Sequence, residues 1–505
     1  MINRFWKNRN IPNKNNLSLF LFISILFIPL FFLNIKNSHD WGGDFALYIH
    51  QAKNFAEGVA QEENGYIFNK YFPLAPKIYP VGFPLLLSPV YLIFGNNMLA
   101  FNYYMSFLLF CLALILVYFF RQHFSLLISV IAVLVIIYNP WMLAFKTEII
   151  ADIPFTLVFI IGLIIYARIK SNYDSIIPNL ALALIAGFLI LIKSIGIIFL
   201  IALIIDSTFE FIKSGKTKTI DRKRVILRYS IPLIALLFYF FVNKTLITKA
   251  NEPLLFFPAL FNLGGLKDIL LRALSYYIEN FQNFFQPDTG KWIFTGLILK
   301  AFALSFLVLG FIISCIRKPG FYELLLLGFL LAILTFPNLA QGFRYLLPVL
   351  PLMIFYIIRG LMLINLNLKL NPIIIILIIG SFILIQYKPG IIKIIREKQE
   401  VIKGPFEPDA LETWNFIKRN TPINTAIAFV KPTVLALYGE RKSIANHYNQ
   451  DFQSMSQTFR ENEIDYFLIN KDLNNQVLEA YIQTRGDSLE LIYNNSSFKL
   501  YKEIH

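Results

Sequence analysis

Charged residues are scarce in this chain. Asp, Glu, Lys and Arg make up 15% of its 505 residues, whereas 57% are hydrophobic. Soluble domains carry about 25% charged residues, so the composition excludes an ordinary soluble fold. Cysteine is nearly absent too. Cys111 and Cys315 both fall inside apolar runs, which argues against a disulfide or a cysteine-bound metal.

Recognisable metal-ligand patterns are also lacking. His39 and His50 lie close in sequence to carboxylates, but their spacing is not that of a zinc site. We therefore assign no metal ligand, and we leave a divalent metal open as a cofactor.

Long apolar runs dominate what is present. Crossing a bilayer takes roughly 17–25 apolar residues. About eleven runs are expected to do so: 17–35, 98–120, 125–141, 149–168, 176–191, 194–209, 229–247, 293–315, 321–337, 345–364 and 372–388. Segment 82–95, broken by Pro84 and Pro89, is expected to be a half-span or an interfacial helix. No small-residue cleavage site follows 17–35, which favours an uncleaved anchor.

The net charge of +15 could indicate nucleic-acid binding, but the basic residues cluster in short segments between apolar runs. This is the positive-inside pattern, so we expect no nucleic-acid partner. It places the loops 36–97 and 248–292 on the outer face of the cytoplasmic membrane. The clusters are Arg4, Lys7, Arg9 and Lys14; Arg168 and Lys170; Lys213, Lys216, Lys218, Arg222, Lys223, Arg224 and Arg228; and Arg317 and Lys318.

These patterns predict a polytopic α-helical membrane protein with about 11–13 transmembrane helices over residues 1–388. Residues 389–505 change character and predict a small α/β domain, also on the periplasmic or extracellular side. Within it, Pro408–Asn420 reads as an amphipathic helix around Leu411, Trp414 and Ile417. Segments 426–430 and 464–469 read as buried strands.

The first outer loop carries two acidic residues at its start, Asp40 and Asp44. Asp44 begins a segment, 45–58, with the apolar stripe of an amphipathic helix. Its carboxylate could cap that helix, which is the simpler explanation. It could also serve chemistry, because ionisable groups near lipid are costly and usually functional.

The second outer turn holds Glu148 and Asp152, spaced so that a helix would place both on one face. An acidic first turn favoured by the helix dipole is the alternative explanation.

Two cations are expected at the same face. Lys193 lies between two apolar runs and could pair with the loop carboxylates or snorkel to the interface. Arg344, followed by Tyr345, could bind phosphate through its planar guanidinium group or act as an interfacial anchor.

Several motifs occur in a recognisable order. An acidic residue with an aromatic-rich amphipathic helix is followed by Tyr-Pro-Val-Gly-Phe-Pro at 79–84 and by the acidic second turn. A Gly-x(5)-Lys element at 187–193 and Arg-Tyr-Leu-Leu-Pro at 344–348 complete the set. Over residues 15–360 this order resembles the GT-C membrane glycosyltransferases, specifically glycosyltransferase family 39 and its relatives. Those include protein O-mannosyltransferases and the bacterial aminoarabinose transferase of lipid A.

The resemblance implies transfer of a sugar from a polyprenyl-phosphate donor to a lipid or cell-envelope glycan, among membrane lipids. It implies that Asp44 is the general base and that Arg344 and Lys193 bind the donor phosphate. Asp40, Tyr345, Glu148 and Asp152 would support the site or hold the acceptor; the last two could also bind a metal.

The sequence departs from the family in three ways. Phe45 follows Asp44 where some members have Glu, and Lys193 stands where arginine is usual. Loop 248–292 is too short for the β-trefoil insert of protein O-mannosyltransferases, which disfavours a protein acceptor. Two other functions stay open: a lipid-linked glycan flippase or transporter, and a surface-glycan polymerase or ligase acting through Glu279, Asp288 and Lys291.

Overall fold

The structure is a computed structural model of the chain. It describes residues 16–69, 71, 76–171, 175–216, 222–246, 263–285, 293–317, 319–336, 342–363, 371–397, 403–445, 450–474 and 476–504.

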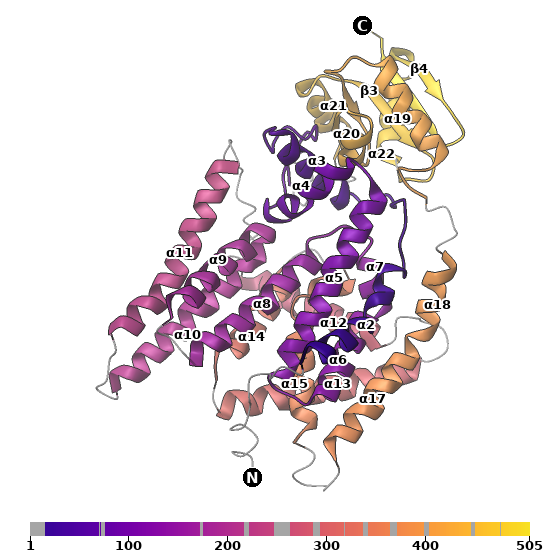
Figure 1. The fold of residues 1–505 in the computed structure, drawn as a ribbon. Coiled ribbons are helices and arrows are strands. Elements are labelled where there is room, and N and C mark those ends of the chain that lie inside the picture. Colours follow the sequence, from indigo (N-terminus) through magenta and orange to yellow (C-terminus); the bar gives the residue numbers. More distant parts are fainter. Residues whose placement is uncertain are drawn as a thin grey trace.

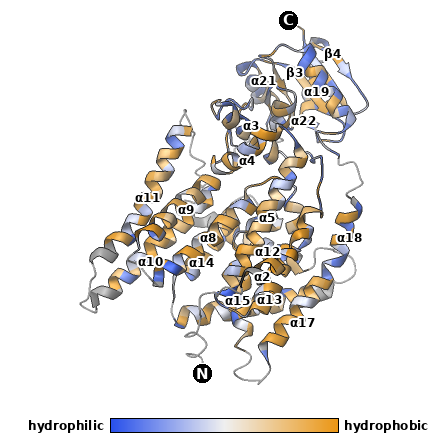
Figure 2. Cartoon of the chain, viewed as in Figure 1, coloured by the Kyte–Doolittle hydropathy of each residue, from blue (hydrophilic) through white to orange (hydrophobic). Residues whose placement is uncertain are grey.

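A bundle of apolar helices forms most of the molecule (Figure 1), and hydrophobic residues cover these helices along most of their length (Figure 2). Six helical segments among the described residues are long and apolar enough to cross a membrane. They are α5 (Met98–Arg121), α8 (Asp152–Ser171), α10 (Ile197–Lys216), α11 (Arg222–Leu246), α13 (Ile293–Arg317), and α17 (Pro372–Gln386) continued by α18 (Lys388–Glu397). The predicted polytopic helical membrane fold is confirmed.

Shorter apolar helices pack among these six. They are α2 (Asn16–Ile25) with the 3-10 turn η1 (Ile28–Phe31), α4 (Gly82–Phe94), α6 (Leu126–Ile137), α9 (Ile176–Ile192), α14 (Phe321–Leu334) and α15 (Leu350–Leu361). At 1.5 Å per residue, α4 is about 20 Å long, short of the roughly 30 Å hydrocarbon core.

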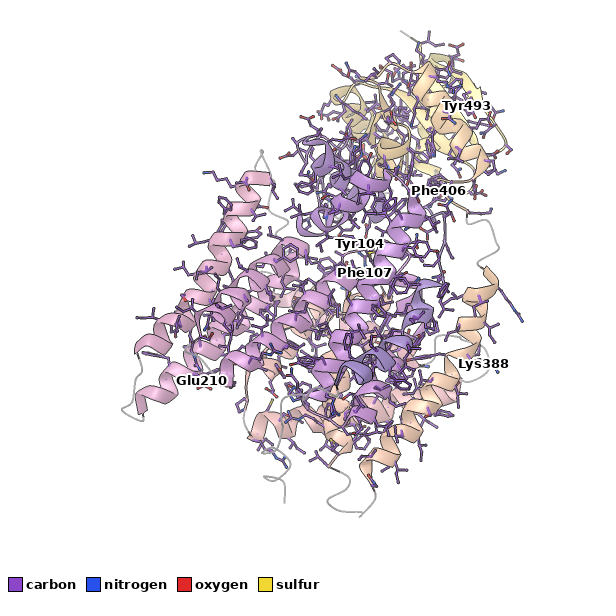
Figure 3. All side chains as sticks on the ribbon, viewed as in Figure 1. Tyr104, Phe107, Glu210, Lys388, Phe406 and Tyr493 are labelled. Carbon is purple, nitrogen blue, oxygen red and sulfur yellow. The ribbon has the colours of Figure 1, made fainter. Side chains whose placement is uncertain are left out.

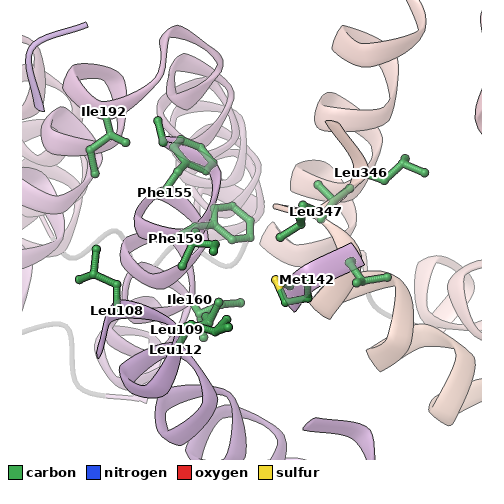
Figure 4. Close-up of a cluster of buried hydrophobic side chains, with 14 of the residues drawn as sticks. Leu108, Leu109, Leu112, Met142, Phe155, Phe159, Ile160, Ile192, Leu346 and Leu347 are labelled. Carbon is green, nitrogen blue, oxygen red and sulfur yellow. The ribbon is translucent and has the colours of Figure 1, made fainter. Parts of the chain in front are cut away.

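Buried side chains from several helices meet at the centre of the bundle. Leu108, Leu109 and Leu112 of α5 face Phe159 and Ile160 of α8 (Figure 4). The outermost helices instead carry exposed aromatic residues, such as Phe240 and Phe241 of α11. This arrangement suits a bundle that is surrounded by lipid.

At one end of α10, Glu210 (Figure 3) forms an ion pair of 3.8 Å with Arg228 of α11.

The segment 248–292, expected as an outer loop, contains the amphipathic helix α12 (Leu263–Phe285). This helix packs against α13 and against the 3-10 turn η4 (Gly342–Leu346). Asp288 and Lys291 lie outside the described residues.

The C-terminal domain is a five-stranded mixed sheet with helices, as predicted. Its order is β2-β1-β3-β5-β4; β1 runs parallel to β2 and β3, and β5 runs antiparallel to β3 and β4. The elements are α19 (Pro408–Asn420), β1 (Ala426–Ala428), α20 (Pro432–Tyr438), β2 (Lys442–Ile444), α21 (Phe452–Glu461), β3 (Ile464–Asn470), α22 (Gln476–Thr484), β4 (Leu489–Asn494) and β5 (Phe498–Glu503).

One detail of the predicted helix is wrong. Trp414 and Ile417 of α19 are buried, but Leu411 is 44% exposed. The sheet covers one stripe of α19, and Leu411 lies outside that stripe.

The predicted domain boundary at residue 389 lies within α18. The compact α/β fold begins at α19.

The first outer loop joins the C-terminal domain to the bundle. Its helix α3 (Asp44–Glu57) packs on α4, and both lie beneath the domain (Figure 1). The backbone of Ile67 donates to Ser443 O at 2.8 Å, and Ser443 N donates to Gly65 O at 2.8 Å, so the loop extends the edge of the sheet. Backbone pairing of this kind fixes two segments firmly together.

Aromatic residues reinforce this junction. Trp41 of the loop lies among Trp414, Phe429 and Phe498, at ring-centroid distances of 6.1 to 6.3 Å. Nearby, Phe406 contacts the ring of Tyr438 edge-on at 5.2 Å (Figure 3). The domain therefore shares a hydrophobic core with the loop that carries Asp44.

A close contact at Gly82 offers a test of this packing. A Cβ at this position would lie 2.7 Å from the carbonyl carbon of Leu191 in α9. We expect Gly82→Ala to lower the melting temperature of the protein in detergent, at a cost of about 1–3 kcal/mol from overpacking.

Gly486→Ala is the matched control, because no atom lies within 4 Å of its added Cβ. Equal melting temperatures for the two variants would contradict the close packing of α4 on α9.

Candidate active site

Asp44 is the first residue of α3, and its side chain does not cap the helix. The N-cap is Gly43, without a side-chain hydrogen bond. Instead, Asp44 Oδ1 accepts a hydrogen bond from Tyr79 Oη at 2.7 Å, and Oδ2 accepts one from Arg344 Nη1 at 2.8 Å. The capping explanation of Asp44 is therefore wrong.

Asp152, at the start of α8, is the second carboxylate bound to Arg344. Its Oδ2 accepts a hydrogen bond from Arg344 Nε at 2.9 Å, and its Oδ1 lies 2.5 Å from Lys193 Nζ. The five side chains form a continuous row: Tyr79, Asp44, Arg344, Asp152 and Lys193. The contact of Lys193 with Asp152 matches the expected pairing of Lys193 with a loop carboxylate, whereas the contacts of Arg344 with Asp44 and Asp152 were not predicted.

Burial differs along this row. The side chain of Asp152 is 0% exposed and that of Arg344 is 14% exposed, whereas that of Asp44 is 35% exposed. Asp152 thus resembles a fixed counter-ion that holds two cations in place. Asp44 is the carboxylate that an incoming molecule can reach.

Local backbone geometry places the two cations. Arg344 lies in η4, which begins at Gly342 with a φ of 56° that suits glycine. Gly342 N donates to Tyr276 Oη at 2.6 Å, and Phe343 stacks on Phe284 at 5.7 Å. The two residues that precede Arg344 are therefore anchored on α12.

Lys193 has extended backbone between α9 and the short turn η2 (Ser194–Gly196). The predicted supporting residue Tyr345 lies beside it, with its ring centroid 5.3 Å from Lys193 Nζ. A cation over an aromatic face is stabilised by the ring quadrupole.

Tyr79 is a site residue that the sequence reasoning did not assign, although it begins the 79–84 motif. The side chain of Gln51 accepts from Tyr79 N at 2.9 Å and donates to Tyr79 O at 3.1 Å. The ring stacks on Tyr48 at 4.5 Å. The 79–84 motif is the sequence feature that could have identified Tyr79, because Gly82 lets this segment approach α9 next to Lys193.

Glu148 does not share a helix face with Asp152, contrary to the expectation from their spacing. Ile149 has a φ of 48°, and α8 begins only at Asp152, so Glu148 lies in a separate turn. It points to His39 and Asp40 instead. One ligand atom from each of these three residues lies within 4.8 Å of the others.

The three residues are electrostatically linked. His39 Nδ1 lies 3.0 Å from Asp40 Oδ1. Burial alone would lower the pKa of His39, but the hydrogen bond to Asp40 and the charges of Glu148 and Asp40 raise it. Burial raises the pKa of Glu148.

One imidazole and two carboxylates form a donor set that divalent ions such as zinc accept. His39, Asp40 and Glu148 are therefore the described residues that could hold such an ion beside the Asp44 row. His50 does not belong to this group; burial and then Lys53 lower its pKa to about 4.

Lys146 is another residue that sequence reasoning missed. It is fully buried, and its Nζ donates to Leu33 O at 2.6 Å, Leu30 O at 3.2 Å and Ser106 Oγ at 2.9 Å. These bonds tie the second outer turn to the chain entering the first outer loop, which sets the relative position of the two acidic segments.

Comparisons with known proteins identify the fold. No family model matches the sequence, and no curated protein matches it. Among solved structures, the archaeal oligosaccharyltransferase AglB from Archaeoglobus fulgidus, in complex with an inhibitory peptide and a dolichol-phosphate, superposes with a TM-score of 0.57. The identity is 12%, over 90% of this chain and 69% of that chain.

ArnT from Cupriavidus metallidurans, bound to undecaprenyl phosphate, superposes with a TM-score of 0.56 at 11% identity, over 98% of this chain and 99% of that one. A second AglB structure, in complex with Zn and sulfate, gives 0.56 at 13% identity, over 96% and 73%. At such identities the likeness is one of fold. The chain has the GT-C fold of polytopic membrane glycosyltransferases.

Proposed function

We propose that this protein transfers a sugar from a polyprenyl-phosphate-linked donor to an acceptor hydroxyl at the outer face of the membrane. The contact of Arg344 with both Asp44 and Asp152 is the observation that carries this proposal. An arginine, a residue type suited to binding phosphate, thus lies next to a reachable carboxylate, and transfer from a glycosyl phosphate requires two such groups. The likeness to AglB and ArnT structures that hold dolichol-phosphate and undecaprenyl phosphate supports the donor class.

In the proposed reaction, the acceptor oxygen attacks the anomeric carbon of the sugar while Asp44 takes the hydroxyl proton. The bond between the anomeric carbon and the phosphate oxygen breaks, and its electron pair leaves with the polyprenyl phosphate. Arg344 and Lys193 stabilise the negative charge that grows on the phosphate. Attack opposite the leaving group inverts the anomeric configuration.

The two carboxylates have different roles in this proposal. Asp152 is buried with both oxygens bound to cations, so it orients Arg344 and Lys193. Asp44 is partly exposed and lies below the C-terminal domain, on the side from which an acceptor would approach. A lipid or cell-envelope glycan acceptor and an active site on the periplasmic or extracellular side of the cytoplasmic membrane complete the proposal.

Replacing Asp44 tests the general base. We expect Asp44→Asn to lower the transfer rate by about 10²–10⁴-fold, because an amide cannot take the proton. The measurement is transfer of radiolabelled sugar in proteoliposomes that contain polyprenyl-phosphate sugar and envelope lipids.

Asp268→Asn, at an exposed position of α12, is the control and should retain full activity. Undiminished transfer by Asp44→Asn would refute the base assignment. Movement of intact lipid-linked sugar without bond cleavage would favour a flippase instead.

Replacing Arg344 tests the phosphate site. Arg344→Lys keeps the charge but cannot reach Asp44 and Asp152 together through Nη1 and Nε. We expect binding of polyprenyl phosphate to weaken about tenfold or more. Binding to the purified protein can be measured by thermal shift across a ligand titration.

The matched control is Arg272→Lys on the exposed side of α12, which should bind polyprenyl phosphate as the parent protein does. Equal affinities of both variants for polyprenyl phosphate would refute the assignment of Arg344 to the donor site.

A further inference from the structure

The C-terminal domain brings a further cation close to Asp44. Thr433, in the first turn of α20, donates a hydrogen bond from Oγ1 to Gly43 O at 3.0 Å. Gly43 directly precedes Asp44, so this bond fixes the beginning of α20 against the beginning of α3. Lys431 lies two residues before Thr433, at the N-cap position of α20.

The side chain of Lys431 is partly buried, and in the described part of the chain its ammonium group makes no ion pair. Burial lowers the pKa of this ammonium group, while the charges of Asp40 and Asp44 act in the opposite direction. Partly buried charges without a direct partner are costly, and a bound anion would offset that cost.

The position of Lys431 is rigidly held. Phe429, two residues earlier, contacts the ring of Trp41 at 6.1 Å, and the sheet edge pairs with residues 65–67 of the first outer loop. The charged turn at residues 440–442 of the same domain is instead bound within the domain itself. Arg441 is buried and donates to Thr421 O and Lys418 O at 2.7 Å, and Glu440 pairs with Lys418 at 2.7 Å.

The charges around Asp44 divide into two groups. Arg344 and Lys193 are matched by Asp44 and Asp152, and they occupy the side on which the donor phosphate is proposed to bind. Lys431 approaches from the C-terminal domain, and its charge interacts with Asp40 and then with Asp44, which are both more exposed than Asp152. An anion bound by Lys431 would therefore belong to the molecule that delivers its hydroxyl to Asp44.

We propose that Lys431 binds an anionic group of the acceptor, a phosphate or a carboxylate, next to the hydroxyl that receives the sugar. This inference rests on the proposed transferase function and specifies its acceptor class. The C-terminal domain then selects acidic acceptors over neutral ones.

Binding measurements on the full chain in nanodiscs test this inference without requiring turnover. The probes are hexyl glucoside, hexyl glucuronide and hexyl glucoside 6-phosphate, with Kd measured by microscale thermophoresis. We expect the protein to bind at least one acidic probe about tenfold more tightly than the neutral one. The two acidic probes distinguish a carboxylate from a phosphate.

Lys431→Gln should bind all three probes alike, and Lys431→Arg should retain the preference for an acidic probe. Lys431→Met, which keeps the apolar stem, replaces the glutamine variant if that variant melts early. Lys499→Gln, at an exposed position of β5, is the charge-matched control.

Equal binding of the three probes by the parent protein would overturn the inference, as would a preference that survives Lys431→Gln. The proposed transferase function fails by a different result, namely movement of intact lipid-linked sugar by the parent protein without cleavage of the sugar–phosphate bond. The two failures are thus separable.

Discussion

The ionic contacts of Arg344 hold together the end of the bundle that faces the C-terminal domain. A single guanidinium bonds Asp44 of the first outer loop and Asp152 of α8, and Asp152 in turn bonds Lys193 after α9. Removing one partner would leave a buried charge uncompensated, which is strongly destabilising in a protein interior. The row therefore constrains four segments that are far apart in sequence to one geometry.

Other features support this row from outside. Buried Lys146 ties the second outer turn to the chain entering the first loop. Gly82 allows the Tyr79 segment to approach α9, and Tyr79 then reaches Asp44. These contacts hold in place the segments that carry the row, and groups held in place in this way are preorganised.

The C-terminal domain is part of the same assembly. The first outer loop pairs with the edge of its sheet through an isolated β-bridge and supplies a tryptophan to its core. Because that loop also carries Asp40 and Asp44, any movement of the domain would be transmitted to the carboxylates. This coupling explains how a lysine from a distant part of the chain comes to act on Asp44.

Sequence patterns predicted the membrane class, most helix positions, and one helix and two strands of the α/β domain. They also predicted Asp44, Asp152, Lys193 and Arg344 as residues of one face. Long apolar runs and isolated charges are local signals, so a single sequence reveals them. The tertiary structure alone decided which charge meets which. It separated Glu148 from Asp152 through the backbone turn at Ile149 and paired Glu148 with His39. It also brought Tyr79, Lys146 and Lys431 to the site, because contacts between distant segments depend on packing, which no local pattern encodes.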